Sequence, residues 1–79
     1  MKARITVTLK SGVLDPQGKA IEGALASLGF AGVSGVRQGK TFDLEIAETD
    51  PAKATNQLQD MAEKLLANTV IEDYRIEMV

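Results

Sequence analysis

With 79 residues, nine basic and eleven acidic side chains, no cysteine and no histidine, this chain is restricted in the chemistry it can perform. Disulfides and thiolate metal sites are excluded, and the commonest general base and metal ligand is missing. A net charge of −2 with no basic block argues against a nucleic-acid partner, as do only three aromatic residues.

The length predicts one domain over residues 1–79 with a modest core, because small domains bury a small share of their surface. Without disulfides, partner chains are the main remaining source of stability, so we expect an oligomer. No apolar run approaches the roughly 20 residues that span a bilayer. The first ten residues alternate like a strand and lack the apolar stretch of a signal peptide. We therefore expect no membrane partner and a cytoplasmic protein.

The first predicted elements are a strand and a helix. Residues 3–10 alternate between apolar and polar side chains, as in a strand buried on one face. Asp15 is predicted to cap a helix that has Pro16 in its first turn and ends at Gly29. The apolar stripe of this helix repeats at three- and four-residue spacing: Ala20, Ile21, Ala24, Leu25 and Leu28.

The middle of the chain predicts a hairpin. Residues 32–38 are interpreted as a short, irregular strand in which Gly35 marks a bulge. Gly39 and Lys40 are the predicted turn. Residues 41–47 alternate cleanly and form the returning strand, with Phe42, Leu44 and Ile46 directed inward.

A second helix and a last strand complete the chain. The helix is capped by Thr49 or Asp50, with Pro51 in its first turn. Its predicted buried stripe is Ala54, Leu58, Met61, Ala62 and Leu65. Residues 67–69 close the helix. Residues 70–79 are predicted to form a strand with Tyr74, Ile76 and Met78 on one face.

The resulting order, β-α-β-β-α-β, predicts an α+β fold with an antiparallel sheet and two helices on one face, the ferredoxin-like element order. The other face of this sheet carries charges of both signs, among them Arg4, Asp43, Asp73 and Arg75. That face is either a solvated surface or a polar oligomer interface with cross-strand ion pairs.

Three segments contain candidate partner contacts. In the loop of residues 12–18, Asp15 suits a helix cap, and Val13 and Gln17 are either part of an ordinary strand-to-helix turn or displayed to another subunit. Arg37 and Lys40 flank the predicted hairpin turn and are interface hot-spot candidates, or simply a solvated tip.

Glu72 lies at the start of the last strand, on the same face as Tyr74 and Ile76. It is an exposed strand end, a contact for a partner's arginine, or a general acid with a raised pKa. No nucleophile–base pair, phosphate-binding loop or clustered acidic loop accompanies it. We therefore expect no catalytic, metal-binding or cofactor-binding residue in this chain.

Three stretches resemble the PurS family: VTLKSGVLDPQGKAI at 7–21, LGFAGVSGVRQGKTFDLEI at 28–46 and MAEKLLANTVIEDYRIE at 61–77. They occur in family order and cover most of the chain. The LDPQG turn, the VRQGK segment and the KLLAN-x-VIEDY ending are jointly specific. One departure is Thr69, where the family usually has proline, which leaves the helix-to-strand turn looser.

The resemblance implies a non-catalytic small subunit of phosphoribosylformylglycinamidine synthase, which makes formylglycinamidine ribonucleotide in purine biosynthesis. It implies two partners, a large synthetase subunit (PurL) and a glutaminase subunit (PurQ), and self-association to a dimer or tetramer. The ATP, Mg²⁺ and glutamine that the complex uses would be bound by the other chains. In this interpretation the small subunit couples glutamine-derived ammonia to the synthetase.

Two other functions fit the same element order, because this fold hosts many roles. An ACT-like regulatory domain would bind an amino acid near a glycine after the first strand, and Gly12 is suitably placed. An acylphosphatase-like enzyme needs an arginine and an asparagine beside a phosphate loop, and no loop here suits it. Binding of a free amino acid to the isolated dimer would favour the regulatory domain.

Overall fold

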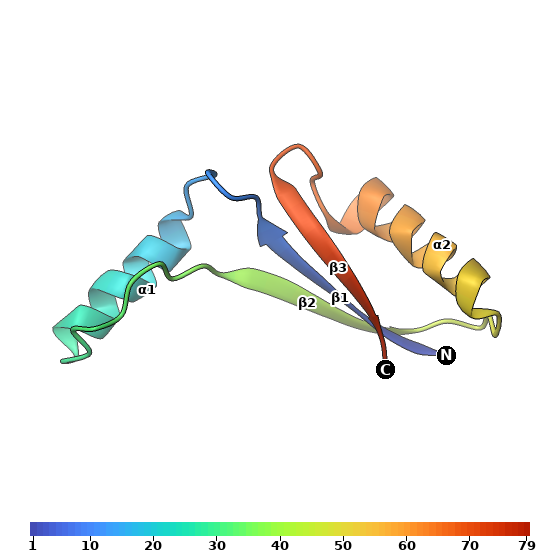
Figure 1. Cartoon of the computed structure of the whole chain (residues 1–79), viewed down its shortest axis with the longest axis horizontal. Helices are drawn as coiled ribbons and strands as arrows, with labels where there is room; N and C mark the ends of the chain where they lie inside the picture. The colour runs from blue at the N-terminus through green and yellow to red at the C-terminus, as the bar shows by residue number, and fades with distance from the viewer.

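In a computed structural model that describes residues 1–79, three strands form one antiparallel sheet in the order β2-β1-β3. The elements along the chain are β1 (Lys2–Leu9), α1 (Pro16–Ser27), β2 (Gly39–Glu45), α2 (Pro51–Met61), the π-helical turn η1 (Ala62–Leu66) and β3 (Glu72–Met78). The predicted α+β class, an antiparallel sheet with two helices, is confirmed (Figure 1).

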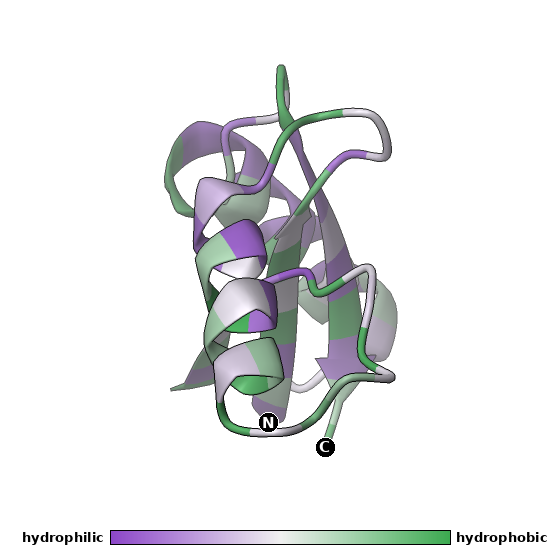
Figure 2. Ribbon diagram, turned by 90° about the vertical axis from the view of Figure 1, so that its left-hand side faces the viewer, coloured by the Kyte–Doolittle hydropathy of each residue, from purple (hydrophilic) through white to green (hydrophobic).

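The core lies between the central strand β1 and helix α2. Ala3, Ile5 and Val7 alternate along β1 and are buried, and Leu58 and Ala62 meet them from the helix side. The same alternation appears as green and purple bands along the strands in Figure 2. Period-two burial is what a strand with one covered face requires, so β1 was predictable from sequence within one residue at each end.

Both helix starts follow their capping residues. The Asp15 carboxylate accepts a hydrogen bond from the Gly18 N–H at 2.8 Å and caps α1. Asp50, rather than the alternative Thr49, caps α2 and accepts from the Ala52 N–H at 2.9 Å. Gly29 follows α1 with a φ of +98°, the left-handed conformation that ends helices at little cost for glycine.

The predicted hairpin at residues 32–40 is wrong. Residues 32–38 form no strand, and Gly39 and Lys40 are the first residues of β2, paired with Thr8 and Val7. The physical reason is local, since Val33 and Val36 are out of phase for one strand face and Gly35 takes a φ of +68°. This segment is an extended return from α1.

The prediction that Leu65 is buried is also wrong, because its side chain is 83% exposed. After Met61 the helix widens into the π-helical turn η1, which inserts an extra residue per turn and shifts the buried face. Leu66 therefore packs against the core in place of Leu65. A single-turn widening of this kind leaves no signature in a period of 3.6 residues.

Helix α1 does not cover the sheet, unlike the prediction that both helices share one face. It points away from the end of β1, while α2 lies along the sheet (Figure 1). The chain is consequently elongated, 48 × 25 × 15 Å, with a radius of gyration of 15.9 Å. A compact chain of this length has a radius of gyration of about 12 Å. None of the buried apolar residues belongs to α1.

The uncovered sheet face carries cross-strand ion pairs. Arg4 and Asp43 approach to 2.7 Å, and Lys2 and Glu45 to 3.7 Å. These side chains are largely exposed. They partly neutralise one another, which suits either alternative for this face. No helix of the chain has the length and apolar character that crossing a lipid bilayer requires.

Candidate functional site at the base of helix α1

The structure brings the six candidate contact residues to one end of the sheet. Asp15, Gln17, Lys40 and Glu72 line a single cleft of about 400 Å³. The cleft lies where β1 ends and where α1, β2 and β3 begin. Val13 and Arg37 lie in the two segments that connect α1 to the sheet and are hydrogen-bonded to each other. Residues far apart in the sequence therefore form one candidate site.

Asp15 is the buried member of this group, with 4% of its surface exposed. Its two carboxylate oxygens accept hydrogen bonds from the Gln38 and Gly18 N–H groups, each at 2.8 Å. The bonds from Gln38 and Gly18 lower the pKa of Asp15, and the nearby Arg37 charge lowers it further. Asp15 therefore stays ionised and joins the start of α1 to the start of β2.

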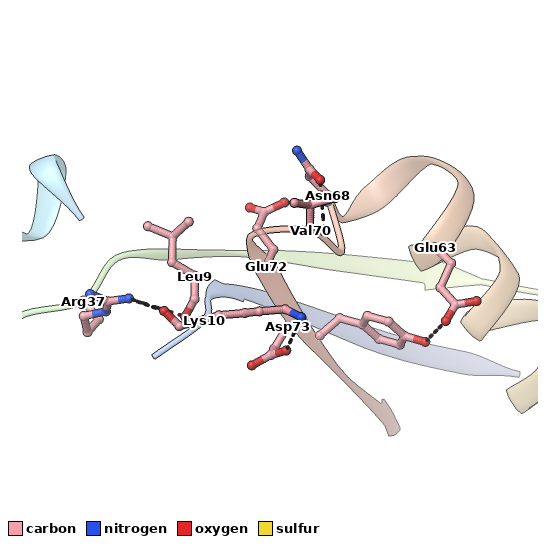
Figure 3. Close-up of polar contacts among 9 residues, drawn as sticks. Leu9, Lys10, Arg37, Glu63, Asn68, Val70, Glu72 and Asp73 are labelled. Atoms are coloured by element: carbon pink, nitrogen blue, oxygen red, sulfur yellow. Dashed lines mark hydrogen bonds and ion pairs between the residues drawn. The ribbon is translucent and has the colours of Figure 1, made fainter. Parts of the chain in front are cut away.

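Arg37 makes the reciprocal connection from the returning segment. Its guanidinium donates to the Val13 carbonyl at 2.8 Å, to that of Lys10 at 3.0 Å and to that of Leu9 at 3.5 Å. The close-up in Figure 3 shows Arg37 directed at this turn. Arg37 is engaged within its own chain, which is a structural role that the sequence did not indicate.

Glu72 closes the turn before β3. One of its carboxylate oxygens accepts from the Asn68 N–H at 2.7 Å, and the Asn68 side chain accepts from the Val70 N–H at 3.2 Å (Figure 3). Thr69 lies within this turn, and the side chains of Asn68 and Glu72 hold the turn together. No cluster of three or more potential metal-ligating side chains exists in the chain.

Lys40 and Gln17 are the side chains that remain available in the cleft. Neither the Lys40 ammonium nor the Gln17 amide makes a hydrogen bond or ion pair within the chain. A cation and an amide donor at the mouth of a polar cleft suit a carboxylate or a backbone carbonyl of another molecule. The arrangement can bind, but it holds no nucleophile–base pair that would catalyse.

Two glycines at this site were missed from the sequence. A Cβ atom on Gly18 would overlap the Val36 carbonyl oxygen, and one on Gly39 would lie 2.6 Å from the Val7 carbonyl oxygen. Both positions allow two backbone segments to approach closely. The signal in the sequence was a glycine in the first turn of a helix, where glycine is otherwise unfavourable.

A second surface, the apolar groove, lies between β2 and α2. It has a volume of about 520 Å³ and is lined mainly by Phe42, Leu44, Met61, Leu65 and Leu66. On the far side of the molecule the apolar stripe of α1 is also uncovered, with Ile21 39% and Leu28 74% exposed. The chain thus displays an unfilled groove and an unpacked helix at the same time.

Comparisons with known proteins identify relatives over nearly the whole chain. The family model described as PurS, phosphoribosylformylglycinamidine (FGAM) synthase, matches residues 2–79. The phosphoribosylformylglycinamidine synthase subunit PurS of Mycobacterium leprae is 53% identical over 75 residues, which cover 95% of this chain and 91% of that protein.

Solved structures have the same fold. Bacillus subtilis PurS superposes with a TM-score of 0.87 at 49% identity, covering 96% of this chain and 94% of that one. A chain of the PurLQS structure from Thermotoga maritima has a TM-score of 0.90 at 33% identity, covering 99% and 95% respectively.

Proposed function

The chain belongs to the PurS family, and we propose that it is the small subunit of phosphoribosylformylglycinamidine synthase that bridges the synthetase and glutaminase subunits. The family match over residues 2–79 carries this proposal. A relative of the same fold occurs in a structure described as PurLQS. The partners of this chain are accordingly a large synthetase subunit and a glutaminase subunit, acting together in the cytoplasm.

The coupling role follows from the chemistry of ammonia transfer. Ammonia released from glutamine is small and is lost to bulk water when it becomes protonated. The site that releases it and the site that consumes it must therefore be held in fixed register. A bridging chain supplies that register without catalysis. The lack of cysteine fits, because a glutaminase nucleophile of that type must lie on another chain. ATP, Mg²⁺ and glutamine are accordingly bound by the partners.

The cleft at the base of α1 is the surface proposed to meet a partner subunit. It places the unpaired Lys40 ammonium and the Gln17 amide beside the rigid Asp15 joint. Polar groups presented from ordered turns give a contact with little conformational entropy to lose. Arg37 supports the cleft from inside the chain, so Lys40 is the better hot-spot candidate of the two cations.

The experiment compares glutamine-driven and ammonia-driven formation of the amidine product by the two partner subunits, with and without this chain. Glutamine-driven turnover should require the chain, whereas ammonia-driven turnover should not. In the same assay, the double variant Gln17→Ala/Lys40→Ala should lower glutamine-driven turnover. The matched control, Lys53→Ala, removes an exposed lysine on α2. Equal turnover without the chain would refute the proposed coupling role.

Self-association is the second part of the proposed function. Helix α1 does not fill the groove of its own chain, because it points away from the sheet (Figure 1). The fold class places two helices on the apolar sheet face, and only α2 is there. The apolar stripe of α1 from a second copy would fill this groove. If each copy places its α1 in the groove of the other, the two copies form a closed two-fold dimer.

Sedimentation equilibrium tests this dimer. Leu28→Asp puts a charge into the apolar stripe and should raise the dimer dissociation constant by about 30-fold, as for an interface hot spot. Ala26→Asp is the matched control, since it places the same charge in the same helical turn on the opposite side. Equal dissociation constants for the two variants would show that the stripe is not the interface.

A further inference from the structure

The connection between α1 and the sheet is made by two short segments, residues 10–15 leaving β1 and residues 36–38 returning to β2. Asp15, on the outgoing segment, holds the Gln38 N–H of the returning one at 2.8 Å. Arg37, on the returning segment, holds the Val13 and Lys10 carbonyl oxygens of the outgoing one at 2.8 and 3.0 Å. Each segment therefore contributes one side chain that hydrogen-bonds to the backbone of the other segment.

Backbone packing reinforces this pair of contacts. Gly18, in the first turn of α1, lies so close to the Val36 carbonyl that no side chain fits between them. The first turn of the helix is thus seated directly on the returning segment. Beyond this joint α1 makes no extensive contact with the sheet or with α2. The direction of the whole helix is consequently set by a handful of contacts at its base.

Rotation of α1 onto its own sheet would carry Asp15 and Gly18 away from Gln38 and Val36. The Gln38 N–H would lose its acceptor, and Asp15 would retain only the bond that caps its own helix. Arg37 would likewise separate from Val13 and Lys10. Charge-assisted hydrogen bonds of this kind are stronger than neutral ones, so their loss disfavours the closed arrangement.

We propose that Asp15 and Arg37 form a reciprocal lock that holds α1 away from its own sheet and presents its apolar stripe to a second copy. The lock thereby disfavours a closed monomer that would fill its own groove. This inference rests on the self-association put forward under the proposed function. Breaking the lock should release α1 and lower the fraction of chains competent to pair.

The absence of cysteine makes a direct distance measurement possible. Spin labels at Ser27→Cys on α1 and Lys53→Cys on α2 report the distance between the two exposed helix positions. Labelled chains are diluted into unlabelled chains, so that only distances within one copy are observed. The test variant is Asp15→Asn/Arg37→Gln. Asparagine keeps an acceptor for the helix cap.

The unmodified joint should give one narrow distance distribution, and the test variant a broad one with a shorter component. The dimer dissociation constant of the variant should rise about tenfold, because the open form is less populated. The matched control is Arg75→Gln/Glu77→Gln, which removes the same two charges from the remote ion pair of the sheet face. It should leave the distance distribution narrow.

An unchanged narrow distribution in the test variant would overturn the lock. Unfolding of both single variants, Asp15→Asn and Arg37→Gln, would overturn it too, because the pair would then serve folding rather than helix direction. A chain that is monomeric at all concentrations, with a narrow distribution that broadens in the variant, would refute the dimer while retaining the joint. The two failures are therefore distinguishable.

Discussion

Two regions of the molecule differ in how far their apolar side chains are buried. One is the sheet with α2, and the other is the arm, formed by α1 and residues 28–38. In the first region, Ile5, Val7 and Leu58 are almost entirely removed from water by neighbours in the same chain. In the second, Leu28 and Phe30 remain more than half exposed. Both regions have an amphipathic pattern, so the pattern identifies an apolar face but does not say which chain covers it.

The arm is held in place by polar contacts, whereas the sheet is held together by burial of apolar side chains. The base of the arm depends on Asp15, Arg37 and two close backbone approaches, whereas the sheet depends on a small packed core. Substitutions should therefore separate the two regions by the kind of effect they produce.

Leu58→Ala should have the largest effect, lowering the free energy of unfolding by about 3 kcal/mol, because it leaves a cavity at a fully buried position. Urea unfolding should give this loss at every protein concentration. Leu28→Ala on the arm is the comparison, and its effect should depend on concentration, since Leu28 is covered only in the proposed dimer. A concentration-independent loss for both would erase the distinction between the regions.

Gly18→Ala should destabilise by about 2 kcal/mol, because the added methyl group overlaps the Val36 carbonyl and forces a backbone shift. Gly23→Ala, on the same helix with open space around it, should stabilise by about 0.5–1 kcal/mol through its helix propensity. Thermal unfolding of the two variants therefore should shift in opposite directions. Shifts of the same sign would show that the base of the arm is not tightly packed.

Acidification should loosen the arm before the sheet. The folded pKa of Asp15 lies below that of the unfolded chain, so its stabilising contribution is fully present above the unfolded pKa of about 3.9. It is lost as the pH falls through the lower folded pKa. Spin-label distances should therefore stay narrow at pH 5 and broaden only below the ordinary carboxyl range. Asp15→Asn should remove this transition.

Lys2→Gln should have the smallest effect, within about 0.5 kcal/mol, because the pair with Glu45 is solvent-exposed at 3.7 Å. Chemical unfolding checks this: raising the salt concentration should change the free energy of unfolding of the unmodified chain and of the variant by almost the same amount. A loss above 1 kcal/mol would instead favour a sheet face that is buried in an oligomer, the second of the two alternatives for this surface.

Capping residues, a helix-ending glycine and apolar alternation correctly predicted the helices and strands in which they occur. Asp15 and Asp50 cap the two helices, Gly29 follows the first, and alternating residues build β1 and β3. The hairpin at residues 32–40 and the burial of Leu65 were wrong. Both depend on features without a local period, a glycine-bent return segment and a π-helical turn.

The candidate site shows the same division. The six candidate contact residues could be chosen from the sequence by residue type alone, because helix caps, exposed cations and turn residues often make contacts. Their convergence in one cleft could not be predicted, since Lys40 and Glu72 come close to Asp15 only because β1 pairs with both other strands. Their role in binding a partner stays a prediction. The internal use of Arg37 also required the fold, because its acceptors lie at least 24 residues away in sequence.

Residue types at short spacing were enough to predict the family, both helices, three of the four expected strands and most of their apolar faces, because these features follow from local patterns. That α1 leaves the sheet, and that the groove beside β2 stays unfilled by its own chain, became visible only in the folded structure. The direction of α1 depends on hydrogen bonds between segments that are distant in sequence. The periodicity of apolar residues carries no information about such long-range contacts, so it cannot predict the direction of the helix.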